Sequence, residues 1–154
     1  MAFHIVLVEP EIPANTGNIA RTCAATGTVL HLVRPLGFDT DDRTLKRAGL
    51  DYWHAVKVVY HDSFAEVKAS YPEGRYFCAT TKASQRYSDF RFQDGDFLVF
   101  GKETKGLPAD ILAAHEETCI RMPMTDAVRS LNLSNSAAII LYEALRQNDF
   151  LELE

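Results

Sequence analysis

Three polar segments of the chain combine residue types that could bind a ligand or take part in catalysis. The first, residues 13–21, reads Pro-Ala-Asn-Thr-Gly-Asn-Ile-Ala-Arg. Gly17 permits a tight turn, Asn15 or Asn18 can cap a helix, and Arg21 stands one turn inside that helix. At a helix N-terminus such residues would clamp an anion or a substrate. The simpler interpretation is a helix cap followed by a solvated arginine.

The second segment, residues 100–108, is a glycine-rich turn that follows an apolar run. Its two glycines stand at the spacing of a phosphate-binding P-loop, but such a loop needs Lys and then Ser or Thr after the second glycine. Leu107 and Pro108 follow instead, so we expect no phosphate cradle of that kind. The turn would still let backbone amides approach a ligand closely. Glu103, in its middle, adds a carboxylate that can accept hydrogen bonds.

The third segment begins with Ile-Arg-Met-Pro-Met at residues 120–124 and continues with Val-Arg-Ser-Leu-Asn-Leu-Ser-Asn-Ser at residues 128–136. It stands directly before an apolar pattern of helical period. Ser134 or Asn135 is expected to cap that helix. Taken alone, each of the three segments is a weak signal.

The elements that must position these segments follow from alternating apolar runs and helical patterns. Short apolar runs predict strands over Phe3–Val8, Val29–Val33, Val56–Tyr60, Tyr76–Thr80, Phe97–Phe100 and Cys119–Met122. Helices are expected over 18–26 with Gly27 as C-cap, from Asp41 or Asp42 through Ala48 to Gly49, over 63–70, after Pro108, and over 134–147. Such alternation favours an α/β fold, a mostly parallel sheet with helices on both faces that binds ligands beyond the carboxyl ends of its strands. With no internal repeat and no linker, residues 1–154 are expected to form one domain.

The composition, 47% hydrophobic and 24% charged residues, is that of a soluble globular protein and excludes collagen-like, coiled-coil and disordered chains. The formal net charge of -5 argues against a general nucleic-acid binder but leaves room for a local basic groove. Cys23, Cys78 and Cys119 are too far apart to suggest a disulfide framework or a metal site. Without a leader or a long apolar run, we expect a cytoplasmic protein that does not enter the membrane.

Taken together, the three segments resemble the ordered motifs of SPOUT-class RNA methyltransferases. The matching patterns are Asn-x-Gly-Asn-x-x-Arg, Phe-Gly-x-Glu-x-x-Gly-Leu, and Ile-x-Met-Pro-Met followed by Ser-Leu-Asn-Leu-Ser. The similarity runs from Phe3 to the last helix. The opening from Ile5 to Asn18 and the segment 47–52 are most similar to the small members that methylate the ribose 2′-oxygen of a tRNA wobble nucleotide, cytidine 34 or 5-carboxymethylaminomethyluridine 34.

The resemblance implies a fold, a cofactor and a mode of assembly. The fold would be of the SPOUT type, with a deep trefoil knot at the C-terminal end of the chain, and the protein would act as a homodimer in which the partner chain completes each active site. The cofactor would be S-adenosylmethionine, converted to S-adenosylhomocysteine. By similarity, its binding residues are Cys78, Ala79, Thr80, Gly101, Glu103, Ile120, Met122, Ser130 and Leu131.

The same resemblance identifies Arg21 as the central catalytic residue, aided by Asn15, Glu103 and Asn132. A guanidinium stays protonated in proteins, so Arg21 is poorly suited to act as a base. We therefore expect it to clamp a phosphate and to orient the 2′-hydroxyl. No grouping of His, Cys and carboxylate residues indicates a metal site.

Two groups of basic residues are candidates for contacting the anticodon stem-loop of a tRNA. They are Arg43, Lys46 and Arg47 on one expected helix, and Lys82 and Arg86 in the long polar stretch 81–96, to which Tyr142 on the last helix is added by the resemblance. Aromatic residues lie among the second group, as is typical of surfaces that stack unpaired bases. The simpler interpretation is that both groups are solvated faces.

Other function classes remain open from the sequence alone. A SPOUT enzyme could act on another tRNA position or on ribosomal RNA. A flavodoxin-like or Rossmann-like nucleotide-binding domain is disfavoured because no Gly-x-Gly-x-x-Gly follows the first strand. A non-catalytic RNA-binding or dimerisation module would have no need of all three motifs.

Overall fold

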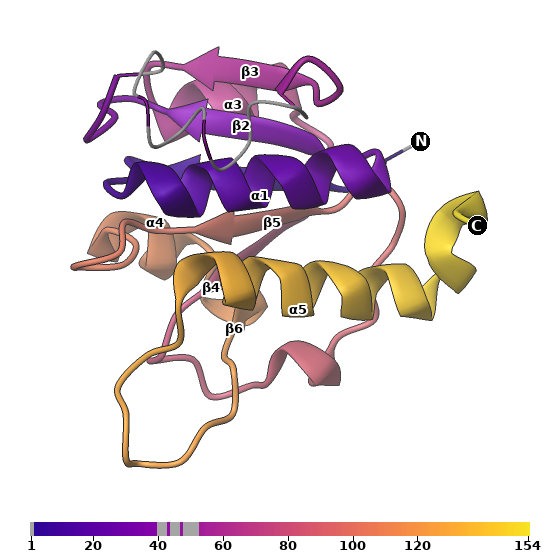
Figure 1. The fold of residues 1–154 in the computed structure, drawn as a ribbon. Coiled ribbons are helices and arrows are strands. Elements are labelled where there is room, and N and C mark those ends of the chain that lie inside the picture. Colours follow the sequence, from indigo (N-terminus) through magenta and orange to yellow (C-terminus); the bar gives the residue numbers. More distant parts are fainter. Residues whose placement is uncertain (1, 40–42, 44–46, 48–52) are drawn as a thin grey trace.

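The computed structural model describes residues 2–39, 43, 47 and 53–154 of the chain (Figure 1). Within this part, one sheet of six strands is parallel throughout, in the order β3-β2-β1-β5-β4-β6. The strands are β1 (His4–Val8), β2 (Val29–Val33), β3 (Val58–His61), β4 (Tyr76–Ala79), β5 (Phe97–Phe100) and β6 (Cys119–Ile120). The predicted parallel α/β fold is confirmed, with the strand ends differing from the expected ones by up to two residues.

The strands are apolar along their length because both faces of the sheet are covered. Within β1, Ile5 and Leu7 point into one core cluster while Val6 and Val8 point into the other. All four side chains are buried. This division between the faces follows from the two-residue period of a strand, and burial on both sides is why a continuous apolar run marks a strand of a parallel sheet.

Helices α1 (Pro13–Thr26) and α5 (Leu133–Gln147) lie side by side on one face (Figure 1). Buried Ile140, Leu141, Ala144 and Leu145 form the α5 side of the core at the helical spacing predicted from the sequence. The other face is covered by α3 (Phe64–Ser70) and α4 (Ala109–Ala114), whose Phe64 and Ile111 pack against it. The expectation of helices on both faces is therefore confirmed.

Several helix ends can be compared with their sequence signals. Gly27 ends α1 at a positive φ of 67°, as expected. The helix expected over 63–70 begins one residue later, at Phe64, because Ser63 is its cap: the Ser63 hydroxyl accepts a hydrogen bond from the Glu66 N–H. The expected start of α1 was wrong: the helix begins at Pro13, a favoured first residue, so Asn15 and Asn18 lie inside it. The expected helix from Asp41 or Asp42 to Gly49 lies outside the described residues, apart from two isolated positions.

Residues 80–96 connect β4 to β5 without an α-helix and contain one short 3-10 turn, η1 (Tyr87–Asp89). The Arg121 N–H donates to the Gln85 carbonyl at 2.9 Å, and the Tyr87 N–H donates to the Arg121 carbonyl at 3.0 Å. At the far end of the loop, the Gln147 side chain accepts from the Phe92 N–H at 2.7 Å and donates to the Phe90 carbonyl at 3.0 Å. The loop is thus joined both to the chain leaving β6 and to the end of α5.

Two further 3-10 turns complete the chain. Turn η2 (Glu116–Thr118) leads from α4 into β6, and η3 (Asp149–Glu152) follows α5. Phe150 and Leu151 in η3 have left-handed backbone angles, with φ of 59° and 46°. That conformation turns the chain sharply away from the axis of α5, as Figure 1 shows at the C-terminal end.

Candidate functional site

The three polar segments meet at the carboxyl edge of the sheet. Residues 9–15 leave β1, residues 101–107 leave the neighbouring β5, and residues 121–132 leave β6 before α5 begins. From β1 the chain continues to β2 and β3, which lie on one side of β1 in the strand order. Strands β5, β4 and β6 lie on the other side of β1. The chain therefore reverses its winding between β1 and β5, where parallel sheets form a ligand-binding crevice.

Glu103 is the residue that ties the first two segments together. Its carboxylate accepts hydrogen bonds from the Glu11 N–H at 2.9 Å, the Ile12 N–H at 2.9 Å and the Asn15 side-chain amide at 3.2 Å. The start of α1 has no side-chain cap of its own. A carboxylate beside the N-terminus of a helix is also favoured by the helix dipole. Glu103 thus acts as a cap supplied from another loop.

Asn132 joins the third segment to the first. Its side-chain amide donates to the Asn15 side-chain oxygen at 3.1 Å. The Asn132 oxygen accepts from the backbone N–H groups of Ser134 and Asn135 at 2.9 and 3.2 Å, which makes Asn132 the cap of α5. The expectation that Ser134 or Asn135 is the cap was wrong. We call the series Glu103–Asn15–Asn132 the amide chain.

The loop after β5 is held in a tight turn. A Cβ atom on Gly101 would lie 2.1 Å from the Gly106 carbonyl carbon and 2.2 Å from the Leu107 nitrogen, so only glycine fits. The Glu11 carboxylate accepts from the Thr104 hydroxyl at 2.7 Å and from its N–H at 3.0 Å. These two hydrogen bonds lower the pKa of Glu11. Glu11 and Glu103 therefore fasten the two loops to each other from both sides.

A cavity of about 510 Å³ opens at this edge, a size typical of small-molecule sites. The structure brings most of the predicted cofactor residues to its wall: Ala79, Thr80, Gly101, Glu103, Ile120, Met122, Ser130 and Leu131. Asn15 and Asn132 line it as well. Residues from three strand ends and from the starts of two helices thus share one concave surface.

Two predicted site residues are not part of this wall. The Cys78 side chain is buried among the residues between the sheet and α3 and α4, because it alternates with Phe77 and Ala79 along β4. Burial raises the pKa of its thiol to about 12. Arg21 lies on α1, exposed to solvent and outside the cavity lining.

The predicted RNA contacts are spread over the surface. Lys82 lines the cavity, whereas Arg86 is exposed further along the same loop. Tyr142 is 45% exposed on α5. Arg43 and Arg47 are exposed, and Lys46 lies outside the described residues.

Sequence reasoning missed several residues of the cavity wall. Three are basic, namely Lys102, Lys105 and Arg129, and others include Thr81, Met124 and Ser136. Thr81 follows the predicted residue Thr80, and the other five stand within one of the three segments, so the position in the sequence was the available signal and the side-chain direction was not. Together with Lys82, the three basic residues give the cavity four basic side chains against one carboxylate, Glu103, although Lys102 pairs with Glu9 at 3.6 Å. The cavity is therefore positive overall in a chain of net charge -5.

Neither a metal centre nor a membrane span is found within the described part of the chain. No group of three or more His, Cys, Asp or Glu side chains in residues 2–39 and 53–154 is placed to hold a metal ion. None of the described helices is long and apolar enough to cross a bilayer.

This combination of fold and site defines an RNA methyltransferase of the SPOUT type. A solved structure described as giving insights into the 2-OH methylation of C/U34 on tRNA superposes with a TM-score of 0.92 at 46% identity, covering 96% of this chain and 97% of that one. The sequence pattern of the SpoU rRNA Methylase family matches residues 2–142. The chain belongs to this family, and the resemblance drawn from the three motifs is confirmed.

Relatives of known name agree with the family match. The tRNA (cytidine(34)-2′-O)-methyltransferase of Methylovorus glucosotrophus (strain SIP3-4) is 54% identical over 96% of this chain and 97% of its own. The enzyme of the same name from Escherichia coli (strain K12) is 52% identical over 94% and 92%. The SpoU methyltransferase AviRb from Streptomyces viridochromogenes, solved with the cofactor AdoMet, is 26% identical with a TM-score of 0.85, covering 96% of this chain and 58% of that chain.

Proposed function

We propose that this protein methylates the ribose 2′-oxygen of the wobble nucleotide, position 34, of a tRNA, using S-adenosylmethionine. The names of the relatives at 52% and 54% identity support this substrate. The observation that carries the chemistry is the amide chain, because it joins all three motifs at the rim of one cavity. Two alternatives that the sequence left open, a Rossmann-like nucleotide-binding domain and a non-catalytic RNA-binding module, lose their support.

The residues of the cavity fit the proposed cofactor. Ile120, Met122 and Leu131 provide an apolar slot for an adenine ring, and the tight turn at Gly101 brings backbone groups close to it. Ser130 and Thr80 add hydroxyl groups for the ribose. The structural relative that was solved in complex with AdoMet supports the choice of cofactor.

S-Adenosylmethionine supplies a methyl group on a positively charged sulfur. The task of this chain is to bind and orient the RNA ribose, whose 2′-hydroxyl proton would pass to a phosphate oxygen or to water. The amide chain fixes the Asn15 side chain in one orientation, since its nitrogen donates to Glu103 and its oxygen accepts from Asn132. Asn15 and Glu103 therefore present fixed polar atoms at the rim, where the ribose would lie.

We assign Arg21 to a clamp on the RNA phosphate, and its position points to a second copy of the chain. Arg21 follows Asn15 by six residues, or about 9 Å along the helix axis, and its side chain is exposed.

On the adjacent α5, four exposed residues form a stripe with helical spacing: Asn135, Ile139, Tyr142 and Arg146. We propose that this α5 stripe and the exposed face of α1 meet the same surfaces of a partner, so that Arg21 of one protomer serves the cavity of the other.

The tRNA would approach the positive mouth of the cavity. Lys82, Lys105 and Arg129 lie there, and Arg86 continues the surface along the 80–96 loop. Arg43, Lys46, Arg47 and Tyr142 stay predictions as contacts to the anticodon stem-loop. A cytoplasmic location suits a tRNA substrate and three cysteines that are all free thiols.

We also propose the trefoil knot expected of the family, within a single domain. Its support is the 80–96 loop, whose hydrogen bonds reach the chain after β6 at Arg121 and the end of α5 at Gln147. The loop thus contacts both ends of the segment 121–147, as the proposed threading of this segment requires.

The test is methyl transfer from labelled S-adenosylmethionine to tRNA from cells that lack this activity. We expect label on the ribose of position 34, located by nuclease mapping. Arg21→Lys should lose at least about tenfold in activity, since an ammonium cannot replace a bidentate guanidinium, while its melting temperature stays unchanged. Arg34→Lys, an exposed arginine paired with Asp62, is the matched control.

Each other outcome of the methyl-transfer assay would contradict a different part of the proposal. Label at another tRNA position or on ribosomal RNA, as the family name allows, would replace the substrate and keep the reaction. Cofactor binding without transfer to any RNA would contradict the catalytic assignment. Near-native activity in Arg21→Lys would contradict the clamp.

A further inference from the structure

Two of the three cysteines, Cys78 and Cys119, come together on neighbouring strands although they are far apart in the sequence. Strands β4 and β6 pair in parallel, with Cys78 directly beside Cys119 and Ala79 beside Ile120. Residues paired in this way have Cα atoms about 4.8 Å apart. That separation lies within the range of about 4.4–6.8 Å that a disulfide bond spans between Cα atoms.

Both thiols point to the same face of the sheet. Cys78 is fully buried in the core cluster beneath α3 and α4, and Cys119 packs against that cluster as a partly buried residue. The next residue along each strand, Ala79 or Ile120, packs in the cluster on the other face. This alternation directs the two cysteine Cβ atoms the same way, as a bridge between them requires.

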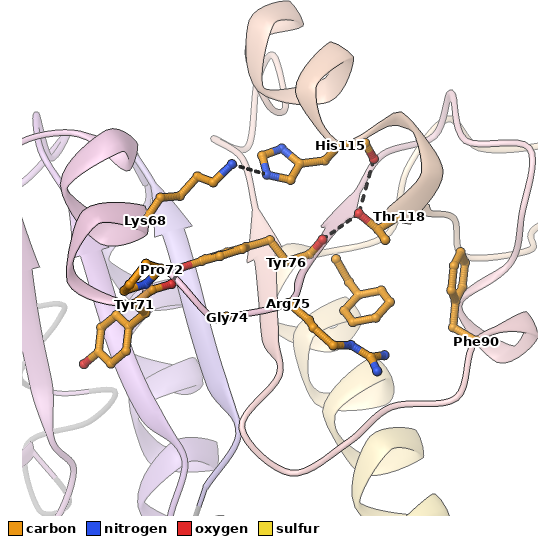
Figure 2. A pocket seen from close by; sticks show the side chains of 10 residues that line it. Lys68, Tyr71, Pro72, Gly74, Arg75, Tyr76, Phe90, His115 and Thr118 are labelled. Carbon is orange, nitrogen blue, oxygen red and sulfur yellow. Dashed lines mark hydrogen bonds between the residues drawn. The ribbon is translucent and has the colours of Figure 1, made fainter.

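Cys78 has a lysine on its side of β4. The Lys68 ammonium donates to His115 Nε2 at 2.9 Å and stands 5.6 Å from the centre of the Tyr76 ring, as Figure 2 shows. Burial and then the Cys119 thiol raise the pKa of Cys78 to about 12, whereas Lys68 acts in the opposite direction. A nearby ammonium favours the thiolate, so Lys68 assists the loss of the Cys78 proton to an attacked partner.

Cys119 is the thiol of the pair that an oxidant can reach. It is partly exposed, whereas Cys78 and Cys23 are buried. Its thiol donates to the Leu112 carbonyl at 3.8 Å, and burial and then the Glu116 carboxylate raise its pKa. Cys119 is therefore protonated at neutral pH and reacts faster as the pH rises. It lies on the face opposite α1 and α5, so the proposed dimer leaves it uncovered.

Strand β6 is able to adjust to a bridge. It consists of two residues and forms the edge of the described sheet, so β4 is the one strand with which it pairs. A small shift of such a strand brings the two sulfur atoms to the bonding distance of about 2.05 Å without disturbing the pairing of β4 with β5. A disulfide closed with such an adjustment is strained, and strained disulfides are easily reduced again.

We propose that Cys78 and Cys119 form a reversible disulfide bond when the protein meets a hydroperoxide. The Cys119 sulfur attacks a peroxide oxygen, the O–O bond breaks, and Cys119 becomes a sulfenic acid. The Cys78 sulfur then attacks the Cys119 sulfur, and the sulfenic oxygen leaves as water with the Cys78 proton. Both sulfur atoms are oxidised, and hydrogen peroxide is reduced to two molecules of water. The inference does not depend on the proposed methyl transfer, because the bond itself is the readout.

The test is oxidation of the full reduced chain with hydrogen peroxide, followed by denaturation, alkylation of the remaining thiols and tryptic mass spectrometry. Lys82 and Lys105 lie between the two cysteines, so trypsin places them in separate peptides. We expect these two peptides to be joined to each other within a single chain, with Cys23 as the thiol that is still alkylated. Dithiothreitol should release the two peptides and restore all three thiols.

Variants distinguish the bridge from oxidation of Cys119 alone. In Cys78→Ala, Cys119 should stop at the sulfenic acid, which dimedone captures. Cys119→Ser should leave Cys78 open to alkylation after denaturation. Cys23→Ala is the matched control, since Cys23 lies in the cluster on the other face, and it should form the bridge as the wild type does.

Three outcomes in the wild-type protein would overturn the proposal. The first is a sulfinic acid at Cys119 with Cys78 still open to alkylation. The second is a disulfide that joins two chains, seen as a dimer on a non-reducing denaturing gel. The third is recovery of all three thiols after peroxide has oxidised the methionines.

Discussion

Asn132 has two separable roles, because different atoms of one side chain perform them. Its oxygen caps α5, and its nitrogen donates to Asn15 in the amide chain. An aspartate keeps the oxygen and lacks the donor, whereas an alanine lacks both. The pair of variants therefore distinguishes stability from organisation of the cavity rim.

We expect Asn132→Ala to lower the free energy of unfolding by about 1 kcal/mol, the usual value of a helix cap. Asn132→Asp should unfold at nearly the wild-type denaturant concentration. Both should lose methyl transfer, since neither holds the Asn15 oxygen. Urea unfolding and the transfer assay measure the two effects, and full activity in Asn132→Asp would show that the amide chain has no part in catalysis.

The loop after β5 is the element on which the cofactor cavity depends most. A methyl group at Gly101 would overlap Gly106 and Leu107, so Gly101→Ala must open the turn. We expect loss of S-adenosylmethionine binding, measured by calorimetry, together with reduced stability. Gly27→Ala is the control: its φ of 67° makes alanine strained by about 1–2 kcal/mol, but no atom lies within 4 Å of the added carbon. If Gly101→Ala binds the cofactor normally, the turn is not part of the site.

The proposed dimer rests on the exposed stripe of α5, where Ile139 is 42% exposed. Ile139→Glu should produce a monomer in sedimentation experiments, since a carboxylate would be buried without a partner in the interface. Val128→Glu changes a residue that is 52% exposed on the loop before α5, and this variant should stay dimeric. A wild-type protein that sediments as a monomer would contradict the assembly.

At the scale of elements, the sequence predicted the strands and most helices because their signals are local. Apolar runs mark β1 and β5. Gly27 directly follows the end of α1, and Ser63 directly precedes the start of α3. The start of α1 was missed because its cap is Glu103, 91 residues away from Ile12. The cap of α5 was misplaced because Asn132, Ser134 and Asn135 are all good caps and only the contact with Asn15 distinguishes them.

In the candidate site, too, the sequence predicted what depends on local signals and missed what depends on contacts between distant residues. Motifs in a known order predicted most residues of the cavity wall. The Cys78 side chain lies outside the wall, because the alternation of β4 places it opposite Phe77 and Ala79. Strand periodicity could have predicted this direction, and the assignment of Cys78 to the cofactor stays a prediction.

For the molecule as a whole, a row of three hydrogen-bonded histidines crosses β1, β2 and β3; His31 and His61 are buried and His4 is half-buried. His4 Nδ1 lies 2.9 Å from His31 Nε2, and His31 Nδ1 lies 2.9 Å from His61 Nε2. Burial lowers the pKa of His4 to about 4 and that of His31 to about 3. Burial lowers the pKa of His61 as well. All three are thus held neutral in the folded protein.

The three histidines predict how the free energy of unfolding depends on pH. Above about pH 6.5 these histidines are neutral in the folded and the unfolded protein, so their full contribution is present. As the pH falls from 6.5 towards 4, the unfolded chain takes up protons that the folded one does not. The free energy of unfolding should therefore fall by up to about 1.4 kcal/mol per pH unit for each fully buried histidine.

The measurement is urea unfolding between pH 7.5 and 5. This range crosses the pKa of a histidine in the unfolded chain, about 6.5. His31→Gln should flatten the slope, and His54→Gln, an exposed histidine, should leave it unchanged. Burial raises the pKa of Asp96, which acts in the opposite direction, so the difference between variants is the readout. Equal slopes for wild type and His31→Gln would show that the histidine chain does not govern acid stability.

The wall of the cofactor cavity has a consequence for how the protein is made. Ile120, Met122, Ser130 and Leu131 are synthesised long after β1, β2 and β3, yet without them the other residues enclose nothing. A nascent chain on the ribosome would therefore have most of its sheet and no place for the methyl donor. For the proposed site, methyl transfer would begin only after the final helix has left the exit tunnel.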